Sequence, residues 1–356
     1  MTIKATYWPW IVTIAIVVLA MYSISGIFLP FVVGLLIAYA MHPTVTRLVS
    51  LGIARGVATL IMILSFFLIV GVLLFVLIPF ITAELGSLAG TLPAYGKRML
   101  EHFLPYLDHL SSFVGSDNLG DLQAKASSYM GDMLSWGVTL IAKLLGNTLA
   151  LATLISLIII TPMVSFYLLR DWPVLLGHLA NLVPRQQVST VVLLAGQIND
   201  TLGAYVRGQS LVCLVLAFLY SFGLWLVGLK YAFTIGIVTG LLSFIPYVGM
   251  LIGFVAGMGV AFAHFDNWLN ILLVATVFVV CNIIEGQFLS PLLVGGRIGL
   301  HPVWVIFALL AGGSLFGFIG LLLALPIAAV LGVLVRFAIS RYLDSPYYYG
   351  DAVKVK

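Results

Sequence analysis

Residues 267–291, NWLNILLVATVFVVCNIIEGQFLSP, decide the fold class of this chain. Residues 267–284 contain no Asp, Glu, Lys or Arg, and Glu285 follows directly. A helix needs roughly 20 apolar residues to cross a hydrocarbon core of about 30 Å. The run therefore predicts a membrane-spanning helix that carries a carboxylate inside the apolar segment.

The same lack of charge recurs along the chain, which is 62% hydrophobic and 8% charged. A soluble domain is about 25% charged, so this composition indicates an outer surface that meets lipid. The apolar runs do not alternate as barrel strands do, and lipid leaves backbone groups no water partner, so helices are predicted. We expect an all-α polytopic membrane protein with about eight hydrophobic segments: 8–25, 27–41, 57–80, 148–169, 208–229, 232–263, 268–294 and 303–336.

Charge and turn signals divide the chain into five predicted parts. These are N-terminal transmembrane segments (1–80), an extracytoplasmic insert of amphipathic helices (81–147), a transmembrane helix with a cytoplasmic connector (148–206), a transport core with broken helices (207–342) and a cytoplasmic tail (343–356). Most short-loop Lys and Arg residues fall on one side if both termini are cytoplasmic. The connector contains an amphipathic helix that either lies on the membrane surface or couples to the next span.

The last two apolar segments are interrupted. Segment 232–263 is too long for one straight span and contains Pro246, and segment 303–336 contains a cluster of glycines. In one topology all eight segments cross. In the other, the two broken segments are re-entrant hairpins, and the last four segments form an inverted repeat of span plus broken helix, as in many secondary transporters. The second topology places Arg297 in the cytoplasm; close helix packing through small residues is the alternative interpretation.

Glu285 is the main candidate for a functional group, because a charge near the bilayer midplane costs at least about 2.5–3.5 kcal/mol. Asn282 lies three residues earlier on the same helical face and can donate a hydrogen bond to it. Arg207 is the obvious basic partner. The alternatives are a structural ion pair, a role in substrate, ion or proton handling, and a carboxylate that only faces a water-filled cavity.

Broken backbone predicts a second kind of chemistry. A helix interrupted near the midplane exposes carbonyls on one half and amides on the other, and these groups can bind a cation or a polar solute. Ser243 and Tyr247 add hydroxyl groups beside Pro246. Enzyme motifs for zinc hydrolysis, a serine nucleophile elbow or a phosphate loop are absent from the sequence. We therefore expect no enzymatic activity, no cofactor, no metal site and no nucleic-acid partner.

Several motifs, in this order, resemble the autoinducer-2 exporter family, also called the PerM-like permeases. They are FLPFVVGLLIAYAMHPTVTRL (28–48), FYLLRD (166–171), YVRGQ (205–209), LLSFIPYVG (241–249), EGQFLSPLLVGGRIGLHP (285–302) and AGGSLFGFIGLLLALPIAA (311–329). The resemblance implies a bacterial inner-membrane permease that forms homo-oligomers, with a pentamer as one form. It adds Gln209, Gly249, Gly312, Gly313 and Gly317 to the candidate residues and maps the family's proline and glutamate onto Pro246 and Glu285.

The resulting hypothesis is a secondary transporter that exports a small polar signalling molecule such as autoinducer-2. A sodium(lithium)/proton antiporter is the first alternative, because Glu285 suits it, and a membrane scaffold without transport activity is the second.

Overall fold

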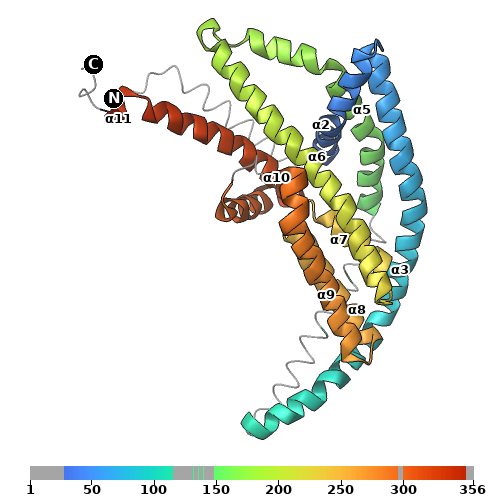
Figure 1. Ribbon diagram of the computed structural model, residues 1–356. Helices are drawn as coiled ribbons and strands as arrows, with labels where there is room; N and C mark the ends of the chain where they lie inside the picture. Colours follow the sequence, from blue (N-terminus) through green and yellow to red (C-terminus); the bar gives the residue numbers. More distant parts are fainter. Residues whose placement is uncertain are drawn as a thin grey trace. The chain divides into compact units, whose positions relative to one another are not determined.

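The computed structural model describes residues 28–114, 131, 135, 139, 148–295 and 300–349. These residues form helices and turns without any strand (Figure 1). The helices are α2 (Phe28–Ser50), α3 (Arg55–Val114), α5 (Thr148–Asn181), η3 (Arg185–Gln187), α6 (Val188–Leu226), α7 (Ala232–Leu242), α8 (Val248–His264), α9 (Trp268–Ile284), η4 (Glu285–Val294), α10 (Pro302–Leu343) and α11 (Pro346–Tyr349).

Six helical stretches of the described residues are long and apolar enough to cross a membrane, and α7 and α8 are shorter apolar helices. The predicted all-α polytopic membrane fold is therefore confirmed. The expected first segment, 8–25, lies outside the described residues. So does Arg297.

Two long helices each cross a boundary between parts of the chain that were predicted to be separate. Helix α3 has 60 residues and a length of about 90 Å, three times the thickness of the hydrocarbon core. Its first part, Arg55–Glu84, is long and apolar enough to cross a membrane, and the helix continues beyond it. Helix α6 combines the amphipathic helix of the connector with the next span in one 39-residue helix. The continuous helix favours coupling to the next span, and the placement of the connector relative to the membrane surface stays a prediction.

The chain folds as two compact units. The first contains residues 1–67, 155–209 and 292–356, and the second contains 68–154 and 210–291. In the first unit, α2 packs closely on α5: a Cβ atom at Gly34 would lie 2.9 Å from Val164, and the Ser165 hydroxyl donates to the Gly34 carbonyl at 3.1 Å. Ala38, Val45, Ala58 and Leu169 continue this contact as a buried core.

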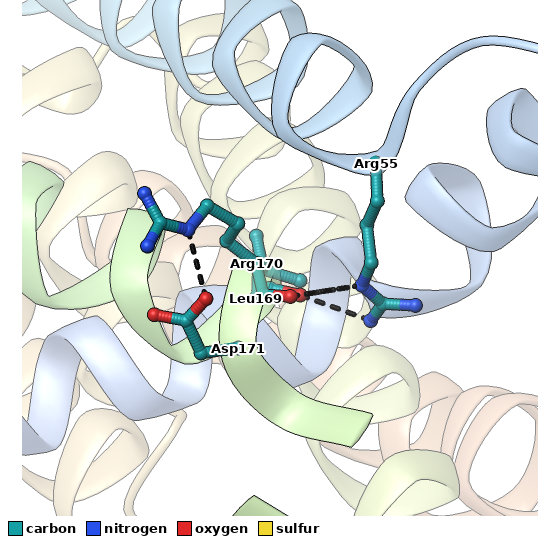
Figure 2. A network of polar contacts seen from close by, with 4 residues as sticks. All are labelled: Arg55, Leu169, Arg170 and Asp171. Carbon is teal, nitrogen blue, oxygen red and sulfur yellow. Dashed lines mark hydrogen bonds and ion pairs between the residues drawn. The ribbon is translucent and has the colours of Figure 1, made fainter. Parts of the chain in front are cut away.

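Arg55, at the start of α3, connects this helix to α5 through hydrogen bonds (Figure 2). Its Nε donates to the carbonyls of Leu169 and Arg170 at 3.1 and 3.2 Å, and its Nη2 donates to the Leu169 carbonyl at 2.9 Å. A helical carbonyl normally accepts from the N–H four residues later, but for Leu169 that residue is Pro173, which has none. Arg55 therefore supplies the donor that the proline removes.

The second unit is built on close contacts at glycines. Gly236 and Gly240 of α7 lie directly against the backbone of Ser221 and Ala217 in α6. Around Phe278 of α9, the ring of Tyr220 lies at 5.2 Å and that of Phe254 at 5.6 Å, measured between centroids. These small and aromatic residues hold α6, α7, α8 and α9 together.

Helices α7 and α8 form an antiparallel hairpin. Gly253 contacts Thr239, and a Cβ atom at Gly249 would lie 2.6 Å from the Ser243 Oγ. At 11 residues α7 is about 16 Å long, which is about half the thickness of a hydrocarbon core, and the chain then turns back. Segment 232–263 is therefore not one straight crossing helix.

Helix α10, in the first unit, contains a second reversal. Gly317 has φ 57° and ψ −135°, which is not helical, and a Cβ atom at Gly312 would lie 2.5 Å from the carbonyl oxygen of Gly320. Two residues eight apart in a straight helix are about 12 Å apart along the axis, so this contact requires a hairpin. The hairpin form of both broken segments favours the re-entrant topology; their placement in the membrane stays a prediction.

Candidate functional site

The tip of the α7–α8 hairpin lies at residues 243–247. Ser243 ends α7: it is buried, and its hydroxyl donates to the Thr239 carbonyl at 2.9 Å. Pro246 sits in the turn and cannot extend α7, since it has no N–H. Tyr247 has φ 66°, a value that costs a non-glycine residue energy, and its side chain is 62% exposed. The turn is therefore held in a strained form with its aromatic side chain directed outward.

The start of α8 carries backbone donors without a side-chain cap. Tyr247 is the N-cap residue and makes no capping hydrogen bond through its side chain. The Val248 N–H donates to the Ile245 carbonyl at 3.3 Å and the Leu251 N–H to the Tyr247 carbonyl at 3.0 Å. For the N–H groups of Gly249 and Met250 the helix provides no internal partner, and the aligned peptide dipoles make this end positive. The hairpin tip therefore offers donors and a favourable potential for an anion or for the oxygen atoms of a polar solute.

Glu285 marks a change of helix type. Helix α9 ends at Ile284, and a π-helix of ten residues, η4, begins at Glu285. π-helices are rare in proteins, and those that occur often lie at functional sites. In this geometry a carbonyl accepts from the N–H five residues later, and for Gly286 that residue is Pro291, which lacks one. The carboxylate and a carbonyl that the proline deprives of its donor are thus neighbours in sequence.

The packing register brings Glu285 to the level of the hairpin tip. Helices α8 and α9 run antiparallel, with Phe254 against Phe278. Seven residues further along α9 and seven residues back along α8 lead to Glu285 and Tyr247. By this register the half-buried Glu285 lies near the level of Tyr247, at the start of α8, which is the positive end of that helix.

Two thiols and one phenol hydroxyl belong to the same unit as Glu285, and these groups are only weakly polar. Cys213 and Cys281 are buried free cysteines, and Tyr220 is buried on the same helix as Cys213. The Tyr220 hydroxyl is fully buried and has no hydrogen-bond partner. No motif in the sequence marks these three residues as part of a site. Only the 3.6-residue spacing of Cys213 and Tyr220, two turns apart on α6, could have linked them.

The other candidate residues are divided between the units. Asn282 belongs to the second unit, as Glu285 does, and its side chain is exposed. Both residues are described in the structure, and no hydrogen bond joins their side chains. Arg207 and the buried Gln209 belong to the first unit, where the neighbouring Gly208 lies against the Leu293 carbonyl. Since Arg207 and Glu285 belong to different units, their ion pair stays a prediction.

The glycine cluster also belongs to the first unit. Gly317 turns the α10 hairpin, Gly312 makes its closest backbone contact, and Gly313 faces the side chain of Leu321 at 3.1 Å. The described residues thus assign each of these three glycines a packing role. A role in binding solute is a separate matter and stays a prediction.

The described residues contain no group of three or more His, Cys, Asp or Glu side chains that could hold a metal ion. The second unit does contain, near one level by helix register, a carboxylate, a carbonyl whose π-helical donor is replaced by a proline, and a helix start without a side-chain cap. Such groups bind a solute through hydrogen bonds and charge without covalent chemistry.

Comparisons with known proteins agree with this picture. The family model described as AI-2E family transporter matches residues 11–339. The candidate transport protein YueF of Bacillus subtilis is 31% identical over 321 residues, which cover 86% of this chain and 83% of YueF. The candidate transport protein YrrI of the same organism is 28% identical over 313 residues, covering 87% of this chain and 86% of YrrI.

A third relative has a named substrate. The AI-2 transport protein TqsA of Escherichia coli is 23% identical over 309 residues, which cover 87% of this chain and 85% of TqsA. The match of the family model to nearly the whole chain, together with the relatives and the polytopic helical fold, shows that this chain belongs to the AI-2E transporter family.

Proposed function

We propose that this protein is a secondary transporter that exports a small polar signalling molecule such as autoinducer-2. Membership of the AI-2E transporter family supports the transport role, and the name of one relative, AI-2 transport protein TqsA, supports the substrate. The proposal includes a location in the bacterial inner membrane with both termini cytoplasmic. It also includes a homo-oligomeric state, for which a pentamer is the form to test.

One observation carries the substrate class. The level of Glu285 combines acceptors, namely its carboxylate and the Gly286 carbonyl, with donors at the uncapped start of α8. A bare cation uses acceptors only, whereas a hydroxylated solute both donates and accepts hydrogen bonds. The mixed set of groups therefore suits a small polyhydroxylated molecule better than an ion.

Each candidate residue receives a role in this proposal. Glu285 accepts hydrogen bonds from the solute and changes its protonation during the cycle. Ser243, Tyr247 and Asn282 contribute hydroxyl or amide groups, Pro246 interrupts the helix, and Gly249 allows α8 to approach Ser243 closely. The residues proposed to act from the first unit are Arg207, Gln209, Gly312, Gly313 and Gly317.

Cation/proton antiport is the second candidate, because a specific feature favours it. Glu285 is half-buried in an apolar segment and can exchange a proton for a monovalent cation that the neighbouring carbonyl helps to bind. In this mechanism the donors at the start of α8 have no ligand to contact. A scaffold without transport activity would use neither set of groups.

Purified protein in liposomes separates the three functions. If the protein is an exporter, liposomes that contain it in the inside-out orientation take up labelled autoinducer-2. The Glu285→Gln variant takes it up more slowly. An antiporter dissipates an imposed pH gradient when sodium or lithium is added. A scaffold does neither. The matched control is Asp266→Asn, which removes an exposed carboxylate of the same unit in the turn between α8 and α9.

A further inference from the structure

The second unit contains a cavity that the proposed function does not use. Its volume is about 100 Å³, and it lies between α3 and the α7–α8 hairpin. One carboxylate lies at the cavity, and the other lining residues carry hydroxyl groups or are apolar. The lining residues are Glu84, Tyr231, Thr234, Ile235, Val238, Thr239, Ile252, Gly253 and Ala256. All of them belong to the second unit.

Among the described residues that line the cavity, Glu84 alone carries a charge. It directly follows 28 residues, 56–83, without any charge, so it sits where the apolar part of α3 ends. Its carboxylate accepts a hydrogen bond from the Thr234 hydroxyl of α7. One hydroxyl leaves most of the acceptor capacity of a carboxylate unused, because its two oxygens offer about four lone-pair sites.

The other polar groups of the lining are already engaged. The Thr239 hydroxyl donates to the Ile235 carbonyl at 2.6 Å, and the Tyr231 hydroxyl is 2.9 Å from that of Ser87. A hard metal cation requires about six oxygen ligands, and the described residues provide no cluster of acidic or metal-binding side chains here. Aliphatic walls cannot replace these ligands, so a bare ion is a poor match.

An ammonium group on a short apolar body matches the cavity better. A primary ammonium donates three hydrogen bonds and pairs with one carboxylate, while its hydrocarbon part packs on Ile235, Val238 and Ile252. A volume of about 100 Å³ leaves room for a ligand of a few non-hydrogen atoms. That is the size of an ethyl- or propylammonium ion.

The chain itself places an ammonium at the rim. The Lys230 Nζ atom lies 4.9 Å from the ring centroid of Tyr231, which lines the cavity. The positive charge of Lys230 opposes a second cation nearby, so an ammonium ligand binds against this repulsion. We propose that the cavity at Glu84 is a binding site for a short primary ammonium compound, separate from Glu285 and independent of the transported solute.

The test measures the binding of propylammonium to the purified full-length protein by ligand-observed NMR. Saturable binding is expected, and neutral propanol of the same size should bind at least about tenfold more weakly, because one charge-assisted hydrogen bond is lost. Glu84→Gln should weaken propylammonium binding by a similar factor, since glutamine keeps the acceptor for Thr234 and loses the charge. Asp266→Asn, which removes an exposed carboxylate elsewhere in the unit, should leave it unchanged.

Two further variants separate shape from charge. Ala256→Leu fills the wall without changing any charge and should abolish binding, and Lys230→Gln should strengthen it severalfold. Equal binding of propanol and propylammonium, or full binding by Glu84→Gln, would overturn the proposal. Displacement of the probe by sodium or lithium at equal concentration would also overturn it, in favour of a metal-cation site. The melting temperature of each variant without ligand checks that it is folded.

Discussion

Replacement of Arg55 offers a quantitative test of how the first unit is held together. The guanidinium makes three contacts, at 3.1, 3.2 and 2.9 Å, with the carbonyls of Leu169 and Arg170. A hydrogen bond to a charged group contributes about 1.5–3 kcal/mol net, and an unsatisfied buried carbonyl costs about 1–3 kcal/mol. Since Arg55 is half-buried, we expect Arg55→Ala to lower the free energy of unfolding by about 2–3 kcal/mol.

The proline provides the control. Pro173→Ala restores the N–H that the Leu169 carbonyl lacks, so in this background the loss of Arg55 should cost less than half as much. Arg170→Ala, which removes an exposed side chain paired with its neighbour Asp171, should have no measurable effect on stability. The assay is unfolding in mixed detergent micelles, followed by circular dichroism, for the four members of the cycle.

The outcome is decisive because the two changes act on one carbonyl group. If Arg55→Ala costs the same in the native background and in the Pro173→Ala background, the assignment of Arg55 as the substitute donor is refuted. A stability unchanged by Arg55→Ala in either background would show that the contacts in Figure 2 do not hold α3 to α5.

Three other changes test the hairpins and their orientation. Gly312→Ala forces a methyl group against the Gly320 carbonyl oxygen and should cost about 1–3 kcal/mol of stability, whereas Gly313→Ala meets only the movable Leu321 side chain and should cost less; equal losses would contradict the α10 hairpin. Pro246→Ala supplies a donor that lengthens α7, so it should slow solute transport in liposomes more than it lowers the melting temperature, and native transport by a folded variant would leave this turn with a packing role only. A cysteine at position 297, in a chain without Cys213 and Cys281, should resist an impermeant thiol reagent applied outside intact cells; strong outside labelling would favour eight full crossings.

The sequence predicts the elements that depend on local composition. Charge-free runs predict the spanning helices, because backbone in lipid must satisfy itself, and Pro246 with Gly249 predicts the break between α7 and α8. The glycines near 317 predict irregular backbone, although only the structure shows that α10 turns back there.

Features that depend on distant partners could not be predicted. Arg55 and Leu169 are 114 residues apart, and Glu84 and Thr234 are 150 residues apart, so neither contact has a local signal. The π-helix at Glu285 depends on which carbonyl each N–H selects, a choice made by packing rather than by residue type. The depth of Glu285 relative to Tyr247 likewise follows from the pairing of Phe254 with Phe278.

The central claim is that Glu285 carries solute transport at the hairpin tip, and one comparison tests it most directly. Transport of labelled autoinducer-2 is measured in liposomes that contain either the native protein or Glu285→Gln, at equal amounts of folded protein. Glutamine keeps the size and hydrogen-bonding capacity of the side chain and removes its titratable charge. The account predicts strongly reduced transport by Glu285→Gln with unchanged stability; native transport rates in the folded variant would contradict it.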